Sequence, residues 1–176
     1  MSKVDRCVVR NQPYTKSAFS IRERHNERLN ESYQNSDIRQ DRHHLNVYFK
    51  QCEGSYAETF EKMQKDDVIR VKGQKKDGSA YVFDEMVFDV NTEYFDRNGG
   101  YEYAKSFFEE AYRLAVEEIG GEQYVLSAVM HADERNVGKI GPYMYHYHNV
   151  RYMRIFITNI TYGNRFFNEA FTSDFI

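Results

Sequence analysis

The stretch "EYAKSFFEEAYRLAVEEIGGEQYVLSAVMH" (residues 102–131) carries a helix pattern, a helix stop and a strand pattern in direct succession. Within 102–119, apolar side chains recur on one helical face: Ala104, Phe107, Phe108, Ala111, Leu114 and Ala115. Gly120 and Gly121 follow, and glycine readily adopts the left-handed conformation that ends helices. Residues 123–131 then read as a strand that stops at His131. The stretch predicts an amphipathic helix followed by a strand of a sheet.

Other segments add strands and a second helix. The segment "SYAETFEKMQKD" opens with Ser55 and has Glu58 three residues later, which is the capping-box spacing that starts a helix. Further strands are predicted where β-branched and aromatic residues gather: residues 43–50, 81–91 and 143–157.

The two ends of this pattern are less regular. Residues 1–10 and 17–22 predict short strands or extended arms around a turn at Pro13. Residues 132–142 are expected to form a loop, so that the last two strands pair as a hairpin. The order of elements predicts an α+β fold with a mainly antiparallel sheet and helices packed on one face.

Composition restricts the class of protein. The chain has 176 residues, of which 41% are hydrophobic and 29% charged, so it is long enough for one globular domain with a core. No secretory leader or membrane-spanning run is visible, and Cys7 and Cys52 are isolated; these features predict a cytoplasmic protein with reduced thiols. The net charge is −3, but residues 1–50 are basic and residues 77–134 strongly acidic, which permits a local phosphate-binding face.

Two histidines lie in "YMYHYHNV" (residues 143–150), separated by one tyrosine. If the segment is a strand, His146 and His148 face the same way. His131 ends the preceding strand, so pairing would bring three imidazoles together, a ligand set that suits a divalent metal with an open position. Glu134 could complete the shell or orient an imidazole. The competing interpretation is that these histidines are packed or surface residues.

A second group of chemically active residues lies in "RERHNER" (residues 22–28). His25 is surrounded there by Arg22, Arg24 and Arg28, and arginine favours phosphate through paired hydrogen bonds. His25 could be a phosphate contact, a general base or a nucleophile. The competing interpretation is a solvated polar helix with no function.

The motifs "RHNER", "HLNV", "HADERN" and "YHYH" together resemble the Mob/Pre relaxases, the plasmid mobilisation and recombination enzymes of the MobV group. The resemblance implies an HUH-endonuclease-like fold and a partner, plasmid DNA, that is nicked on one strand at a transfer origin and rejoined. It implies a covalent histidine–5′-phosphate intermediate and a divalent cofactor, Mn²⁺ or Mg²⁺. The resemblance also implies that full-length relatives extend further and can form homodimers.

The resemblance also implies roles for individual residues. His25 is the nucleophile, and its neighbour Glu27 is a candidate to orient it. The metal ligands are His131, His146, His148 and Glu134. The residues expected to contact DNA are Arg22, Arg24, Asn26, Arg28, Arg42, His44 and Asn46.

Some positions depart from the family pattern. Many members have a tyrosine directly after "HLN", where this chain has Val47 and places Tyr48 one residue later. Close relatives continue "HYHLH", whereas this chain reads "HYHNV". Two registers are therefore open: either His146 and His148 are the metal ligands, or His148 is one ligand and Val150 occupies the position of the other.

Beyond Asn149 the resemblance is lost. We therefore expect an incomplete relaxase-like catalytic domain over residues 1–150 and a divergent tail over residues 151–176, as in a truncated copy. One alternative function is a catalytically inactive DNA-binding protein that recognises the origin or its own promoter. A third, a rolling-circle replication initiator, would need a catalytic tyrosine on a helix, and Tyr152 and Tyr162 lack a helical context.

Overall fold

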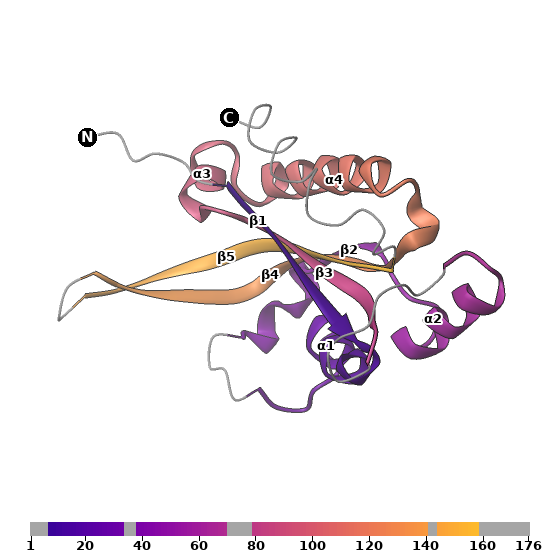
Figure 1. The fold of residues 1–176 in the computed structure, drawn as a ribbon. Helices are drawn as coiled ribbons and strands as arrows, with labels where there is room; N and C mark the ends of the chain where they lie inside the picture. The colour runs from indigo at the N-terminus through magenta and orange to yellow at the C-terminus, as the bar shows by residue number, and fades with distance from the viewer. Residues whose placement is uncertain (1–6, 34–37, 70–78, 141–143, 159–176) are drawn as a thin grey trace.

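The fold is built on a five-stranded antiparallel sheet (Figure 1). The structure is a computed structural model that describes residues 7–33, 38–69, 79–140 and 144–158, with only the backbone described over 135–152. The strands are β1 (Cys7–Thr15), β2 (Val47–Lys50), β3 (Tyr81–Val90), β4 (Val125–Ile140) and β5 (Met144–Ile157). Their order across the sheet is β1-β3-β5-β4-β2, so the last strand in the chain is the central one.

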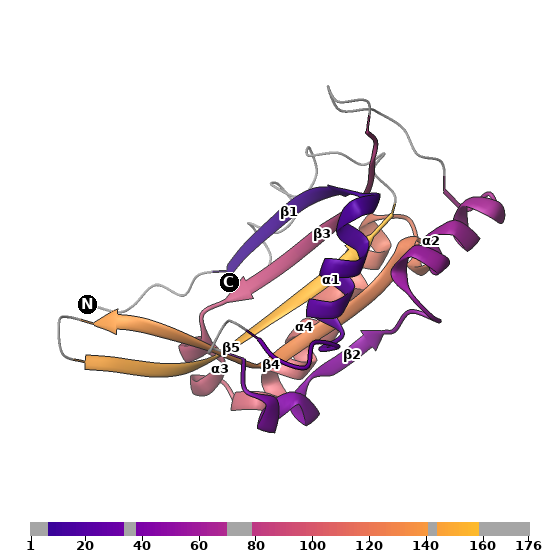
Figure 2. The same ribbon diagram turned by 90° about the horizontal axis from the view of Figure 1, so that it is seen from below.

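Helices cover both faces of this sheet. The α-helices are α1 (Phe19–Asn26), α2 (Tyr56–Lys65), α3 (Thr92–Arg97) and α4 (Gly100–Glu118). The 3₁₀ turns are η1 (Lys16–Ala18), η2 (Gln40–Leu45) and η3 (Glu122–Tyr124). Figure 2 shows α1 and α2 across the near face of the sheet, with α4 behind it. The α+β fold with an antiparallel sheet is confirmed, but α1 and α2 add a layer on the face that was predicted to be bare.

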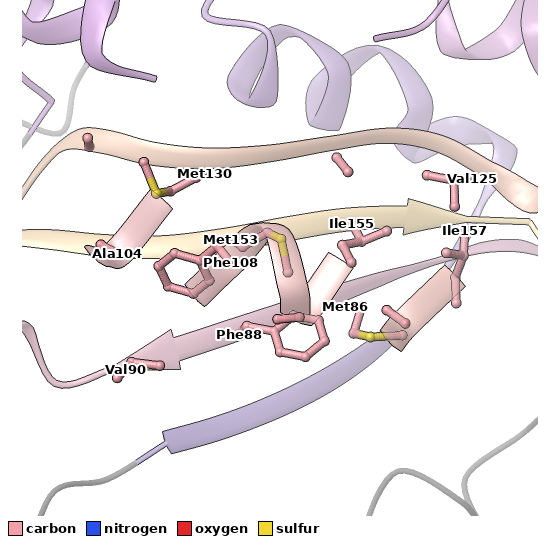
Figure 3. Close-up of a cluster of buried hydrophobic side chains, with 14 of the residues drawn as sticks. Met86, Phe88, Val90, Ala104, Phe108, Val125, Met130, Met153, Ile155 and Ile157 are labelled. Carbon is pink, nitrogen blue, oxygen red and sulfur yellow. The ribbon is translucent and has the colours of Figure 1, made fainter. Parts of the chain in front are cut away.

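Alternation along β5 explains why two layers form. Met153, Ile155 and Ile157 are buried on the α4 side, in one hydrophobic cluster with Phe108 of α4 (Figure 3). Phe156 points to the opposite face and joins the cluster under α1 and α2. Successive residues of a strand point to opposite faces of the sheet. A central strand that is apolar on both faces must therefore be covered by helices on both faces.

The clearest sequence patterns are found where they were expected. Helix α4 begins two residues before the predicted segment 102–119 and ends one residue before its end. In α2 the Ser55 hydroxyl accepts from the Glu58 amide at 3.2 Å, and the Glu58 carboxylate accepts from the Ser55 amide at 3.0 Å, which confirms the capping box. Strand β3 matches the predicted 81–91 segment within one residue.

The N-terminal third differs from the prediction. Pro13 lies inside β1 opposite Asp84 rather than at a turn. An edge strand tolerates proline because the missing amide can face away from the ladder. The predicted extended arm at 17–22 is instead η1 and the start of α1, anchored by the buried Phe19. Residues 43–45 belong to η2, so the strand predicted from residue 43 begins only at Val47.

The predicted loop at 132–142 is also mostly strand. Strand β4 continues to Ile140 and pairs with β5 as a long hairpin, which confirms the predicted pairing of the last two strands. Strand β5 runs through residue 150, where the domain boundary was predicted, and its buried residues Met153, Ile155, Phe156 and Ile157 complete the middle of the sheet. The remainder of the predicted tail, residues 159–176, lies outside the described residues, so the predicted truncation stays a prediction.

Candidate active site at the end of helix α1

His25 lies at the C-terminal end of α1 with its side chain 31% exposed. Its Nε2 is 3.6 Å from Oε1 of Glu134 on β4. Two residues after the helix, Arg28 adopts a φ of 56°, which turns the chain back. The Arg28 Nη1 then donates to the backbone oxygen of His25 at 2.7 Å. The motif therefore folds on itself and presents His25 to solvent beside a carboxylate of the sheet.

Arg28 ties this motif to β4. Its Nε and Nη2 donate to the two oxygens of Asp133 at 2.7 Å each, and Nη2 also donates to Glu134 at 2.8 Å. The side chains of Arg28 and Asp133 are 4% and 0% exposed. Burial opposes ionisation of Asp133, but the nearby His131 ring and the hydrogen bonds from Arg28 hold its pKa far below the usual value. A direct contact between Arg28 and DNA, as predicted, would require these buried ion pairs to open.

The "HLN" segment holds β4 from another side. Asn46 donates to Asp133 Oδ2 at 2.9 Å and accepts from the amide of Ala132 at 2.8 Å. Arg42 Nε donates to the carbonyl of Ala132 at 3.1 Å. Of the three residues predicted here to contact DNA, Arg42 and Asn46 therefore bind protein groups, and His44 is exposed.

Asn26 and Glu27 face the interior. The Asn26 Oδ1 is 3.2 Å from Nε2 of His131, and both side chains are fully buried. The Glu27 carboxylate accepts hydrogen bonds from Tyr56 and Ser127, each at 2.7 Å. Glu134, predicted as a metal ligand, is thus the carboxylate beside the imidazole of His25, whereas Glu27 belongs to a buried polar cluster.

Positive charges surround His25. Arg22 Nη1 lies 3.5 Å from the buried carboxylate of Glu85, which is also ion-paired with Arg154 on β5. The pKa of His25 is lowered by burial and by the charges of Arg154 and Arg28, and these effects outweigh the opposing carboxylates of Glu134 and Glu85. His25 is therefore neutral at pH 7. Arg24 is exposed and donates to Asn30 at 3.0 Å.

The register of the β4–β5 hairpin does not place the histidines of β5 opposite His131; they pair with residues further along β4. His131 pairs with Tyr152 just before a bulge in β4, whereas His148 pairs with Asn136 and His146 with Gly138 beyond that bulge. The side chains of residues 135–152 lie outside the described residues, so the ligand set of His131, His146, His148 and Glu134 stays a prediction. Among the side chains that are described, no three His, Cys, Asp or Glu gather as a metal-holding group.

The donor chemistry on β4 nevertheless suits a divalent ion. Burial lowers the pKa of His131 to about 4, and interaction with Asp133 offsets this only in part, so the ring is neutral at pH 7. A neutral imidazole and an ionised carboxylate are the forms that bind Mn²⁺ or Mg²⁺. His131 and Glu134 fit this requirement, and Glu134 remains partly accessible with its side chain 15% exposed.

A model of the plasmid recombination enzyme family, Mob_Pre, matches residues 3–174. The chain belongs to this family. The match extends beyond Asn149, where the sequence resemblance was expected to end. No curated protein matches the chain. Among the described residues, no helix is both long and apolar enough to cross a membrane.

Solved structures with the same fold include several of the MobM relaxase domain (MOBV; Mob_Pre). One, Mn-bound at pH 6.8 with plasmid pMV158 oriT DNA of 22 nucleotides and a 3′ thiophosphate, superposes with a TM-score of 0.67. The two sequences are 23% identical, and the superposition covers 86% of this chain and 69% of the MobM chain. A second, Mn-bound at pH 4.6 with the 22-nucleotide DNA, has a TM-score of 0.64 at 22% identity. At these identities the likeness establishes the fold of this Mob_Pre member.

Sequence reasoning missed several residues that the candidate site contains. Tyr56 lies in the helix predicted after Ser55, and Ser127 in the strand predicted over residues 123–131, but neither falls in a motif. Arg154 and Glu85 were missed because an ion pair between two strands leaves no spacing signal. Alternation does offer one hint: Arg154 is a charged residue between buried neighbours in a central strand, and such a charge needs a partner.

Acidification from pH 7 to pH 4 is expected to destabilise the fold. The buried His131 stays largely neutral over this range in the folded protein, whereas the same residue takes up a proton in the unfolded chain. Its pKa is 6.5 in the reference state and about 4 in the fold, so the unfolded chain binds more protons between these values. The free energy of unfolding should therefore fall as the pH falls, by about 3 kcal/mol from this group. His25, whose pKa is also lowered, acts with the same sign.

Urea unfolding in a chelating buffer at pH 7, 5.5 and 4 measures this dependence. His131→Gln should show a smaller decrease over the same range, because the titrating ring is gone. A wild-type midpoint that stays constant down to pH 4 would contradict the assignment of a neutral, buried His131.

Proposed function

We propose that this Mob_Pre member is a DNA strand transferase that nicks one strand and rejoins it through His25. The lone pair of the neutral imidazole attacks a phosphorus atom, a P–N bond forms, and the P–O3′ bond breaks. The phosphorylated ring releases its remaining N–H proton to Glu134, the 3′ oxygen leaves with a proton from water, and the 5′ phosphate remains on the protein. Attack by a 3′ hydroxyl reverses the step. The observation that carries this proposal is a half-buried, neutral His25 held beside Glu134 at an accessible helix end.

Positioning of the ring is the first requirement of phosphoryl transfer. We assign the orienting role to Glu134, because its carboxylate is 3.6 Å from His25 Nε2 while Glu27 is engaged elsewhere. A hydrogen bond from Nε2 to Glu134 would tighten when DNA binds, as catalytic contacts often do. It would leave the lone pair on the other ring nitrogen for attack.

Neutralising phosphate charge is the second requirement. Arg22 and Arg154 share the buried Glu85 near His25, so a bound phosphate would add a second anion to an existing pair of guanidiniums. Arg24 and His44 are exposed and would contact the strand on either side. The predicted ligands His131, Glu134, His146 and His148 would hold Mn²⁺ or Mg²⁺. A bound divalent ion supplies polarisation of a phosphate oxygen.

Relaxation of supercoiled plasmids tests the proposal. The plasmids carry, in overlapping segments, the DNA that flanks the gene, and the assay contains Mn²⁺ or a chelator. We expect one segment to yield nicked circles with protein covalently attached. Gel-shift binding with no nicking in any segment would favour the second candidate, a DNA-binding protein without catalysis. The register that pairs His148 with Asn136, away from His131, is the observation that favours this alternative.

Arg154→Gln is expected to move the acidic limb of the nicking pH profile to higher pH. Loss of the nearby cation raises the pKa of His25, so a larger fraction of the ring is protonated and inactive at pH 6. The ratio of the single-turnover rates at pH 8 and pH 6 should rise. Arg154→Lys keeps the charge and should retain the wild-type midpoint, as should Arg113→Gln on exposed α4. A midpoint that moves to lower pH in Arg154→Gln would contradict the charge assignment.

A further inference from the structure

A buried chain of hydrogen bonds runs from Tyr56 on α2 to His131 on β4. Tyr56, Ser127, Asn26 and His131 are all fully buried. At the centre of the chain, Oε1 of Glu27 accepts from the Tyr56 hydroxyl and from the Ser127 hydroxyl, each at 2.7 Å. Polar groups buried this deeply need their partners, so the geometry of the cluster is fixed by the direction of each hydrogen bond.

The carboxylate determines that direction. An ionised carboxylate only accepts hydrogen bonds, so both hydroxyls point their hydrogens at Glu27. Their oxygens then serve as acceptors for Asn26, whose Nδ2 lies 2.7 Å from the Tyr56 oxygen and 3.3 Å from the Ser127 oxygen. The same Nδ2 is 3.1 Å from Glu27 Oε1. A reversed amide would place its oxygen against that carboxylate oxygen, so only one orientation of Asn26 is compatible with the cluster.

The orientation of Asn26 in turn determines which nitrogen of His131 carries the proton. Asn26 Oδ1 is 3.2 Å from Nε2 of His131 and can only accept. In the neutral ring the hydrogen is therefore on Nε2, and Nδ1 carries the lone pair. Nδ1 is 3.7 Å from the nearest oxygen of Asp133, which is longer than a hydrogen bond, whereas the 3.2 Å contact between Nε2 and Asn26 Oδ1 is within hydrogen-bond range.

We infer that Tyr56 and Ser127 are positioning residues that fix the tautomer and the ring orientation of His131 through Glu27 and Asn26. The importance of the His131 ring for catalysis rests on the proposed function. The direction of the hydrogen bonds from Tyr56 and Ser127 to His131 does not depend on that proposal. Groups that orient an active-site imidazole from behind typically contribute about 10- to 100-fold to metal affinity or activity. Loss of the Tyr56 hydroxyl removes both a donor to Glu27 and the closest acceptor of the Asn26 amide.

The test uses the full chain labelled with ¹⁵N-histidine, without metal, at pH 7. Long-range ¹H–¹⁵N spectra distinguish protonated from unprotonated ring nitrogens, and His131→Gln assigns the signal. We expect wild-type His131 to be protonated on Nε2, and Tyr56→Phe and Ser127→Ala to show a mixture of tautomers or the Nδ1–H form. Tyr112→Phe is the matched control, since its hydroxyl donates to Glu122 at 2.7 Å on exposed α4; it should leave the spectrum unchanged.

A wild-type ring protonated on Nδ1 would overturn the inference, as would wild-type spectra in both folded variants. If Tyr56→Phe fails to fold by near-ultraviolet circular dichroism, Ser127→Ala decides the outcome, because it removes a single oxygen. In the nicking assay both variants should lose about 10- to 100-fold in rate with unchanged DNA affinity. Altered tautomers in the variants of a protein that nicks no DNA would support the hydrogen-bond order and refute the proposed function.

Discussion

His25→Ala is expected to lower the single-turnover rate of DNA nicking by on the order of 10³-fold or more, because it removes the proposed nucleophile rather than a supporting contact. The side chain is half-buried at the end of α1, and its methyl replacement leaves the ion pairs of Arg28 in place. The fold and the affinity for DNA should therefore change little. Single-turnover nicking and filter binding on the same DNA separate the two quantities.

Two tyrosines, one beside His25 and one just after the "HLN" segment, supply the control. Tyr33 packs edge-on to the His25 ring at 6.4 Å between centroids. Tyr48 on β2 lies one residue after Val47, which occupies the position where many family members have a tyrosine. Burial raises the pKa of Tyr48 to about 12, which makes its hydroxyl a poor nucleophile at pH 7. Tyr33→Phe and Tyr48→Phe should both nick DNA. Loss of nicking in Tyr48→Phe with activity retained in His25→Ala would assign the nucleophile to tyrosine.

Arg28→Gln is expected to reduce the free energy of unfolding by about 3–5 kcal/mol, because it leaves the fully buried carboxylate of Asp133 without its main partner. Removing one member of a buried ion pair costs more than the pair contributes, since the remaining charge stays desolvated. Arg28→Lys should recover only part of the loss, because an ammonium group cannot reproduce the paired bonds to Asp133.

Arg113→Gln is the matched control for this stability measurement. Arg113 also pairs with two carboxylates, Glu110 and Glu117, but on the solvent side of α4. Exposed ion pairs contribute little, so its urea midpoint should match the wild type. Equal losses in the Arg28 and Arg113 variants would show that the Arg28 cluster is no more than a surface network.

The parts of the fold that sequence predicted well are those in which local and long-range preferences agree. In α4 the apolar stripe, the terminal glycines and the burial of Phe108 all favour the same helix. In α2 the capping box marks the first turn directly. The prediction of an extended arm at residues 17–22 was wrong. The helix found there depends on the burial of Phe19 against the sheet, which no local sequence pattern reveals.

Sequence patterns predicted most residues of the candidate site but not the directions in which their side chains point. The motif around His25 was found, but sequence adjacency could not show that Asn26 and Arg28 turn inward to β4 while His25 faces outward. That separation follows from the helix ending after Asn26 and from the left-handed Arg28. The ion pair of Arg154 with Glu85 joins two strands far apart in sequence, so it becomes visible only in the folded sheet.

Mapping the covalent adduct tests the central claim most directly. The protein is incubated with Mn²⁺ and single-stranded oligonucleotides that tile the DNA flanking the gene, then denatured, digested and sequenced by mass spectrometry. The account predicts a nucleotide 5′-phosphate attached to His25 through nitrogen, acid-labile and absent from His25→Ala. A phosphate attached to Tyr33, Tyr48 or any other residue, or cleaved DNA with no attached protein, would contradict it.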